Sequence, residues 1–128
     1  MNMNFPTELK YTKHDEWVKM IDETTALVGI TDFAQDQLSD IVFVTLPEVG
    51  DEAVADEKYG DVESTKAVSD LVSPVSGTIA AVNTDLDDSP ELLNEDPYAN
   101  WIIKVENVSG FAAGLMDADA YIADTQSR

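Results

Sequence analysis

Short apolar and alternating runs, separated by turn-forming residues, are the feature that most restricts how this chain can fold. Each run is too short for a typical helix and is bounded by Gly, Pro, Asn or Asp, which is the pattern of strands and turns. The predicted strands span residues 16–20, 25–30, 41–46, 52–56, 61–64, 67–72, 77–82 and 101–105. So many short strands predict a mainly β fold, either a flattened barrel or a sandwich.

Two segments carry helix signals instead. Residues 31–38 begin with Thr31, a helix-capping residue, and place apolar side chains on one face. Residues 117–124 repeat this pattern after Asp117, so we expect a second helix there. A brief helical turn is also expected at 90–93, where a proline can occupy the first position.

The charge of the chain is strongly negative. Seven Lys and Arg residues stand against 26 Asp and Glu, for a net charge of −19, and the acids are spread along all 128 residues. Residues 1–128 are expected to form one domain with a solvated acidic surface. Because salt screens the repulsion between such charges, the composition predicts a salt-adapted source. No basic stripe is present to neutralise phosphates, which argues against a nucleic-acid partner.

Several classes of activity lack their usual residues. Cysteine is absent and His14 is the only histidine, which excludes disulfides, thiolate metal sites and multi-histidine metal sites. Residues 85–90 are acidic, but Pro90 stands where a calcium loop requires glycine. No phosphate-binding or nucleophile motif occurs, so we expect neither an enzyme nor a metal site. The absence of a signal peptide or long apolar run predicts a cytoplasmic protein that does not enter membranes.

Lys66 is the residue whose surroundings are unusual. Residues 63–70 read Glu-Ser-Thr-Lys-Ala-Val-Ser-Asp, and 64–67 form a short reversal between two predicted strands. Lys66 would therefore occupy a hairpin tip, where the small neighbours Thr65 and Ala67 leave its amine open to an outside enzyme. An exposed lysine that only keeps a sheet edge soluble is the simpler alternative.

The segments around Lys66 and elsewhere form one specific pattern. They are residues 60–71, 74–77 and Asn83, then 11–13, 16–18, 29–35, 46–50 and 93–98, followed by Trp101. Over nearly its whole length the chain resembles the H protein of the glycine cleavage system, a lipoyl carrier. It departs from that family at Asp15, where the family usually has histidine; here His14 comes one place earlier. The stretch from Tyr98 to Trp101 also looks one residue short.

The resemblance implies a cofactor and a set of partners. It implies a barrel-sandwich hybrid of the lipoyl/biotinyl type, with lipoic acid joined to Lys66 as an amide. The lipoyl group and the lysine side chain together would form a long flexible arm. A pyridoxal-phosphate glycine decarboxylase would load an aminomethyl group onto this arm, and a tetrahydrofolate-dependent aminomethyltransferase would remove it. A dihydrolipoyl dehydrogenase using FAD and NAD would reoxidise the arm, and a lipoate ligase or lipoyltransferase would attach it. The carrier itself would catalyse nothing.

Four further residues receive roles from the resemblance. Glu63 is expected to contact the lipoylating enzyme. Glu16 and Asp70, with His14 as a third position, are expected to form a groove for the loaded arm, where carboxylates can bind its ammonium group. Each could instead be an ordinary surface residue, while Phe33, Trp17, Tyr98 and Trp101 are expected in the core or at its rim.

Two other functions stay open at this level. One is a lipoyl relay, a related carrier that supplies lipoyl groups to other 2-oxoacid dehydrogenase complexes. The other is an unmodified acidic interaction module, in which Lys66 carries nothing.

Overall fold

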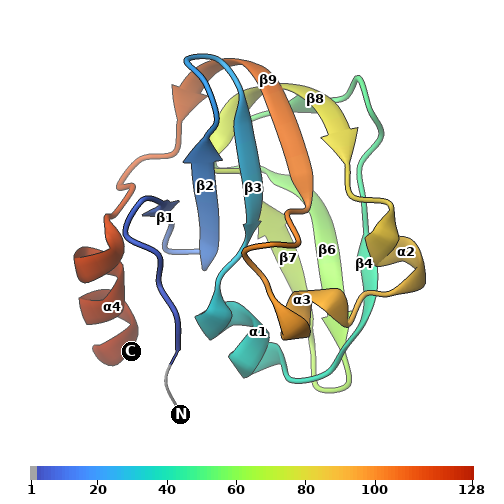
Figure 1. Cartoon of the computed structure of the whole chain (residues 1–128), viewed down its shortest axis with the longest axis vertical. Coiled ribbons are helices and arrows are strands. Elements are labelled where there is room, and N and C mark those ends of the chain that lie inside the picture. Colours follow the sequence, from blue (N-terminus) through green and yellow to red (C-terminus); the bar gives the residue numbers. More distant parts are fainter. Residues whose placement is uncertain (1–2) are drawn as a thin grey trace.

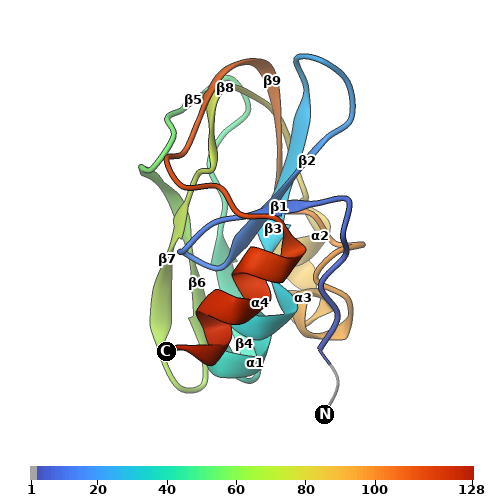
Figure 2. The same ribbon diagram turned by 90° about the vertical axis from the view of Figure 1, so that its left-hand side faces the viewer.

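Two antiparallel sheets face each other in the part of the chain that the structure, a computed structural model, describes, which is residues 3–128 (Figures 1 and 2). The larger sheet has the strand order β1-β2-β3-β9-β8-β5, and the smaller has the order β4-β6-β7. The strands are β1 (Lys10–Tyr11), β2 (Glu16–Met20), β3 (Ala26–Ile30), β4 (Ile41–Thr45), β5 (Glu52–Ala53), β6 (Lys58–Ser64), β7 (Val68–Val72), β8 (Val75–Val82) and β9 (Ile103–Phe111). The predicted mainly β fold is confirmed in its sandwich form, because within this range the two sheets do not close into one barrel.

The predicted strands are found with shifted ends. The run at 52–56 forms only the two-residue strand β5, whereas the run at 101–105 is part of β9, which continues to Phe111. The second half of β9 has no clear strand pattern in the sequence. It contains several polar residues, Gly110, and Asn107, whose backbone adopts a positive φ of 53°. Pairing with β8 keeps that half extended. The short edge strand β1 was not predicted, because two residues carry no periodicity.

Both main helices lie where they were expected. Helix α1 (Asp32–Leu38) begins after Thr31, whose side chain accepts a hydrogen bond from the Ala34 amide at 3.1 Å. Helix α4 (Ala118–Gln126) begins after Asp117, which accepts from the Ala120 amide at 2.9 Å. Each cap satisfies an amide that has no partner within the helix.

The connection between β8 and β9 contains two single-turn helices. The turn predicted at 90–93 lies slightly later, as α3 (Leu92–Glu95), and α2 (Asp85–Asp88) was not predicted. Leu86 of α2 and Leu93 of α3 are fully buried, so tertiary packing of these leucines holds both turns.

Two apolar clusters stabilise this arrangement. The main cluster fills the space between the sheets, with Val28 and Ile103 from one sheet facing Val44 and Val62 from the other. The second cluster joins α4 to β1 and β2, and its centre is a stacked pair, Tyr11 and Tyr121, with ring centroids 4.7 Å apart. The expectation that Phe33, Trp17, Tyr98 and Trp101 serve the core or its rim is confirmed, since all four belong to the second cluster.

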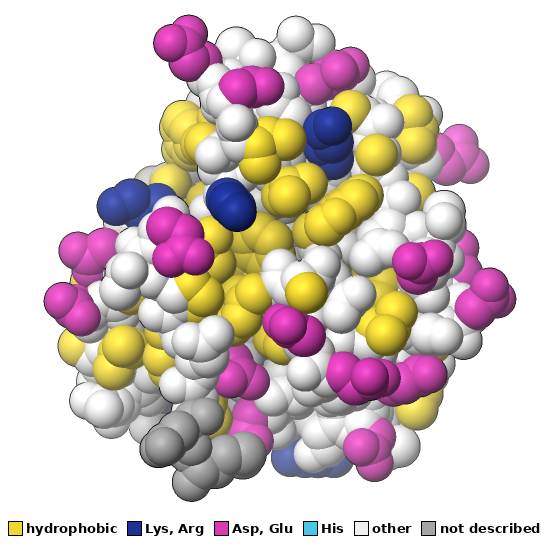
Figure 3. Space-filling model, viewed as in Figure 1, with side chains coloured by type: hydrophobic (Ala, Val, Ile, Leu, Met, Phe, Trp, Pro, Cys, Tyr) yellow, Lys and Arg dark blue, Asp and Glu magenta, His cyan; other side chains and the backbone are white. Residues whose placement is uncertain are grey.

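The charged surface is mixed rather than divided into blocks. Figure 3 shows acidic side chains spread around one face, with Lys or Arg side chains and apolar side chains interspersed among them. Among residues 3–128, no helix is both long and apolar enough to cross a bilayer. A single domain over the whole chain and a cytoplasmic location remain predictions.

Candidate functional site

A hairpin formed by β6 and β7 carries Lys66 at its tip, as predicted from the sequence. The two strands pair from Lys58 opposite Val72 to Glu63 opposite Val68, and the turn between them exposes Lys66 to solvent. In Figure 1 this hairpin reaches the lower end of the molecule, opposite the connections at the top. The fold therefore exposes the Lys66 amine at the end of a paired β-hairpin.

Ser64 organises the tip. Its hydroxyl oxygen accepts hydrogen bonds from the amides of Lys66 and Ala67, each at 3.1 Å, and lies 3.2 Å from the Ala67 carbonyl, to which it can donate. The Ser64 amide donates to the same carbonyl at 2.8 Å. A side chain that bonds to nearby backbone in this way defines a turn.

A neighbouring loop supports the hairpin from one side. The amide of Thr65 donates to the Asp40 carbonyl at 3.0 Å. Asn94 holds this loop, because its side chain accepts from the Ile41 amide at 2.9 Å and donates to the Ser39 carbonyl at 2.7 Å. The tip is thus tied through Asp40 and Asn94 to helix α3.

The Lys66 amine is directed toward α1. Its Nζ atom donates to the Gln37 carbonyl at 3.2 Å, in the last turn of that helix, where carbonyls lack intrahelical partners. Gln37 and Ala67 both line a cleft that opens beside the tip. A group attached to Lys66 would therefore start at the mouth of this cleft.

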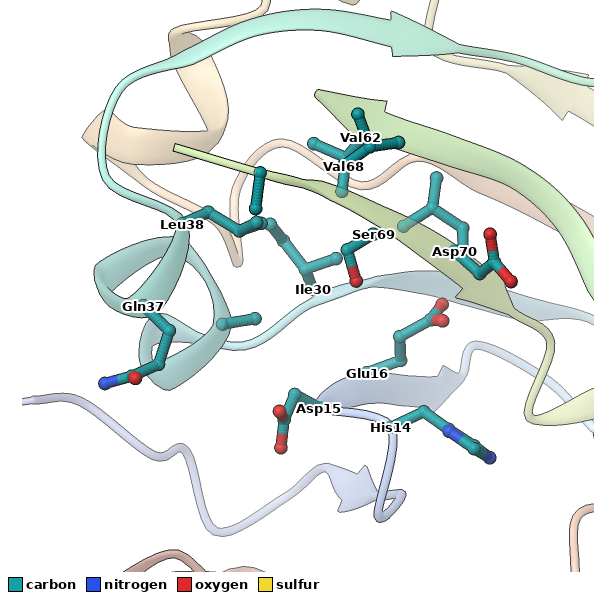
Figure 4. Close-up of a pocket in the computed structure, with 13 residues that line it drawn as sticks. His14, Asp15, Glu16, Ile30, Gln37, Leu38, Val62, Val68, Ser69 and Asp70 are labelled. Carbon is teal, nitrogen blue, oxygen red and sulfur yellow. The ribbon is translucent and has the colours of Figure 1, made fainter. Parts of the chain in front are cut away.

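The cleft has an apolar wall and a polar end. Its volume is about 310 Å³, and it lies between β7, α1 and the start of β2 (Figure 4). The wall is formed by Ile30, Ala34, Leu38, Val62, Val68 and Leu71, and the polar end by His14, Asp15, Glu16, Ser69 and Asp70. The three predicted groove residues, Glu16, Asp70 and His14, are thus brought to one cleft.

Glu16 is buried rather than displayed on the surface. Only 1% of it is exposed, and its carboxylate accepts hydrogen bonds from the Tyr59 hydroxyl at 2.8 Å and from the Val72 amide. Burial raises the pKa of Glu16 well above its ordinary value, although the two hydrogen bonds oppose this shift. Figure 4 shows this carboxylate directed at β7, so Glu16 joins β2 to the far end of the hairpin.

Asp70 and His14 lie in open positions. The Asp70 side chain is 63% exposed and pairs with Lys58 Nζ at 3.2 Å, and the same amine lies 3.6 Å from Asp61. His14 is exposed at the end of the cleft, and its ring points away from β7 in Figure 4. Asp70 is therefore the groove carboxylate most accessible to a ligand.

Asp15, which stands where the family usually has histidine, is hydrogen-bonded to Tyr121 of helix α4 and to Arg128 just after it. Its carboxylate accepts from Arg128 Nη1 at 2.7 and 2.9 Å and from the Tyr121 hydroxyl at 2.9 Å. Arg128 also lies over the Phe33 ring, 5.3 Å from its centroid. This edge of the cleft is thus formed by a contact between distant segments.

Glu63 is not part of the cleft. It is exposed on the outer side of the three-stranded sheet, between Phe43 and Val68 in the strand register. Val44 and Val62, one residue along, point inward to the core. The structure therefore keeps Glu63 out of the cleft that Glu16, Asp70 and His14 line.

Some residues of the site had no recognisable signal in the sequence. Tyr59, which donates to Glu16, and Gln37, which contacts Lys66 through its carbonyl, lie 43 and 29 residues from those partners. Lys58, which pairs with Asp70, was equally unmarked. Only the strand register places these groups together. Within residues 3–128, no grouping of acidic and histidine side chains forms a metal site.

The fold and the lysine-tipped hairpin define a β sandwich of the lipoyl/biotinyl type. Residues 9–128 match the sequence model of the glycine cleavage H-protein family. The chain is 54% identical over 125 residues to the glycine cleavage system H protein of Mycobacterium avium, covering 92% of this chain and 94% of that one. A probable glycine cleavage system H protein of Thermococcus gammatolerans is 53% identical over 115 residues, covering 88% and 86%.

A solved structure agrees with these sequence comparisons. The crystal structure of a glycine cleavage system H protein from Mycobacterium marinum superposes with a TM-score of 0.87 at 39% identity, covering 95% of this chain and 99% of that one. This chain belongs to the glycine cleavage H-protein family.

Proposed function

We propose that this chain carries its lipoyl group on Lys66. Membership of the family makes the chain a lipoyl carrier of the glycine cleavage system and not a catalyst. The observation that supports Lys66 is its place at the tip of a hydrogen-bonded hairpin, with its amine at the mouth of a cleft. The lysine amine would displace the leaving group of an activated lipoyl group, such as an acyl adenylate, and release a proton as the amide forms.

The residues of the cleft fit a lipoyl arm. An eight-carbon acyl chain can lie along the apolar wall, and the polar end of the cleft can receive a charged group carried at its tip. When attached, the lipoyl group supplies the dithiolane sulfur that a chain without cysteine lacks. The amide also removes the positive charge that Lys66 now directs at the Gln37 carbonyl and leaves its nitrogen with a single N–H donor, which weakens that contact.

We further propose that Glu16, Asp70 and His14 receive the aminomethyl-loaded arm. Asp70 is the exposed carboxylate and would give its ammonium group a charge-assisted hydrogen bond, exchanging Lys58 for the ligand. Buried Glu16 would act mainly by holding β7 against β2, so that Asp70 stays at the cleft. His14, at the outer end, would limit access of water.

The proposed partners follow from the same role. They are a pyridoxal-phosphate glycine decarboxylase, a tetrahydrofolate-dependent aminomethyltransferase, a dihydrolipoyl dehydrogenase that uses FAD and NAD, and a lipoate ligase or lipoyltransferase. Each acts on the group at Lys66.

Intact-protein mass spectrometry tests the attachment site. After incubation with lipoate, ATP and a lipoate ligase, the protein should gain the mass of one lipoyl group, and Lys66→Arg should gain none. Lys104→Arg, a control with the same change on a different sheet, should be lipoylated normally. Lipoylation of Lys66→Arg would refute the proposed site. Loading of the lipoylated protein from glycine by the decarboxylase would distinguish glycine cleavage from a pure lipoyl relay.

A further inference from the structure

An exposed apolar surface lies beside Lys66 on the outer side of the three-stranded sheet. Val42, Phe43 and Val68 are 48%, 53% and 63% exposed. Phe43 pairs with Glu63 and Glu63 pairs with Val68, so these three side chains form one row across β4, β6 and β7. We call Val42, Phe43, Glu63 and Val68 the hairpin face.

Acidic side chains lie within the hairpin face and next to it. Glu63 lies within it, and the next row across the same strands contains Asp61 and Asp70. Lys58 contacts both of these aspartates but is a single cation against three acids. A complementary partner would therefore offer an apolar contact bordered by Lys or Arg side chains.

The hairpin face and the arm cleft share only Val68. Val62 and Leu71 line the cleft from the inner side of the sheet, whereas the row containing Phe43 and Val68 alternates with them and points outward. Although Val68 also borders the cleft, Phe43 and Val42 do not. A partner can thus contact the outer row whether or not an arm occupies the cleft.

We propose that the hairpin face is the docking surface for the enzyme that acylates Lys66, an inference that rests on the proposed function of Lys66. The lysine side chain has a stem of only four carbons. An enzyme that brings the Lys66 amine to an activated acyl group must therefore contact the hairpin tip and the adjoining strands. The enzymes that act on the finished arm work on sulfur atoms that lie an acyl chain away from the lysine nitrogen, so they need not press against the hairpin face. Glu63 would face the basic border of the acylating enzyme, with Phe43 and Val68 on either side as apolar anchors.

The kinetics of lipoylation test this assignment. The double variant Val42→Thr/Phe43→Thr keeps strand-forming side chains of reduced apolar area, changes no residue that lines the cleft, and should fold, which circular dichroism checks. We expect its kcat/KM for lipoylation by a lipoate ligase to fall at least about tenfold, as for loss of an interface anchor. Phe111→Thr is the matched control, since Phe111 is 50% exposed and is the last residue of β9, which ends near the top of Figure 1, away from the β6–β7 hairpin. Its kcat/KM should change less than about twofold.

A competition measurement isolates docking from chemistry. Lys66→Arg, which should bind the ligase without being acylated, should inhibit lipoylation of the wild type. The triple variant Val42→Thr/Phe43→Thr/Lys66→Arg should inhibit much less. Equal inhibition by both variants, or a double variant that is lipoylated as fast as the wild type, would overturn the proposal.

The finished arm provides a separate readout. The double variant, lipoylated to completion with excess ligase, should be loaded from glycine by the decarboxylase at the wild-type rate. A loading defect as large as the lipoylation defect would overturn the assignment to the acylating enzyme. A wild-type chain that gains no lipoyl group would instead refute the proposed function, and the docking proposal with it.

Discussion

Arg128 Nη1 lies 2.7 Å from Asp15 Oδ1, joining residues that are 113 positions apart. The same guanidinium binds Asp124 at 2.7 Å through Nη2 and covers Phe33. Asp15 also accepts from Tyr121 of the stacked pair. The end of the chain is thereby fastened to the edge of the arm cleft.

Loss of this contact should destabilise the protein. Arg128→Gln leaves two carboxylates without their cation, and because the pair is only partly exposed we expect a loss of about 1 kcal/mol in the free energy of unfolding. Lys58→Gln removes the same charge from a more exposed pair, so the loss in the free energy of unfolding should be clearly smaller. Urea denaturation of both variants measures the difference. Equal losses would show that net charge, not this contact, determines the effect.

The position of β6 depends on Gly60. A Cβ at this residue would overlap the Thr45 carbonyl of β4, so Gly60→Ala should force the strands apart and destabilise the fold by about 1–3 kcal/mol. Gly110→Ala is the control, because its nearest neighbour would lie 3.9 Å away, and there the added methyl group should change stability by less than about 1 kcal/mol. Thermal unfolding compares the two. A stable Gly60→Ala protein would contradict the close approach of β4 and β6.

Glu16 should make stability depend on pH in a defined direction. Burial raises its pKa in the folded state, so between its ordinary value of 4.5 and the higher folded value the folded protein binds a proton that the unfolded chain has lost. This group therefore destabilises the fold progressively as pH rises through that interval. Glu16→Gln, which can still bond to Tyr59 and Val72, should gain stability relative to the wild type between pH 5 and pH 8.

Urea denaturation of both proteins across that range measures this effect. The difference between them isolates Glu16 from the other 25 acidic residues, since these are common to both proteins. Asp70→Asn is a control at an exposed carboxylate and should not show the same trend. A difference between wild type and Glu16→Gln that is constant with pH would exclude a raised pKa.

The acidic surface should make stability depend on salt. With a net charge of −19, repulsion extends about 30 Å at 0.01 M salt but only about 3 Å at 1 M, so the melting temperature should rise as sodium chloride is added. The rise should shrink at pH 4, where many carboxylates are protonated. A melting temperature that does not change with salt at pH 7 would refute both this prediction and the inferred salt adaptation.

The sequence alone determined most of the strands, the two longer helices and the hairpin tip that carries Lys66. Alternating apolar runs predicted the strands and two capped segments predicted α1 and α4, because side-chain periodicity and capping act over a few residues. The small residues around Lys66 predicted its hairpin tip for the same reason. The grouping of Glu16, Asp70 and His14 came from the family resemblance, since no local pattern joins them.

Only the tertiary structure decided what surrounds these residues. It buried Glu16 against Tyr59 and Val72, left Asp70 exposed beside Lys58, and placed Glu63 on the outer face. Such contacts join positions far apart in the chain. They depend on which strands pair and in which register, and a shift of one residue would turn each side chain to the opposite face of its sheet.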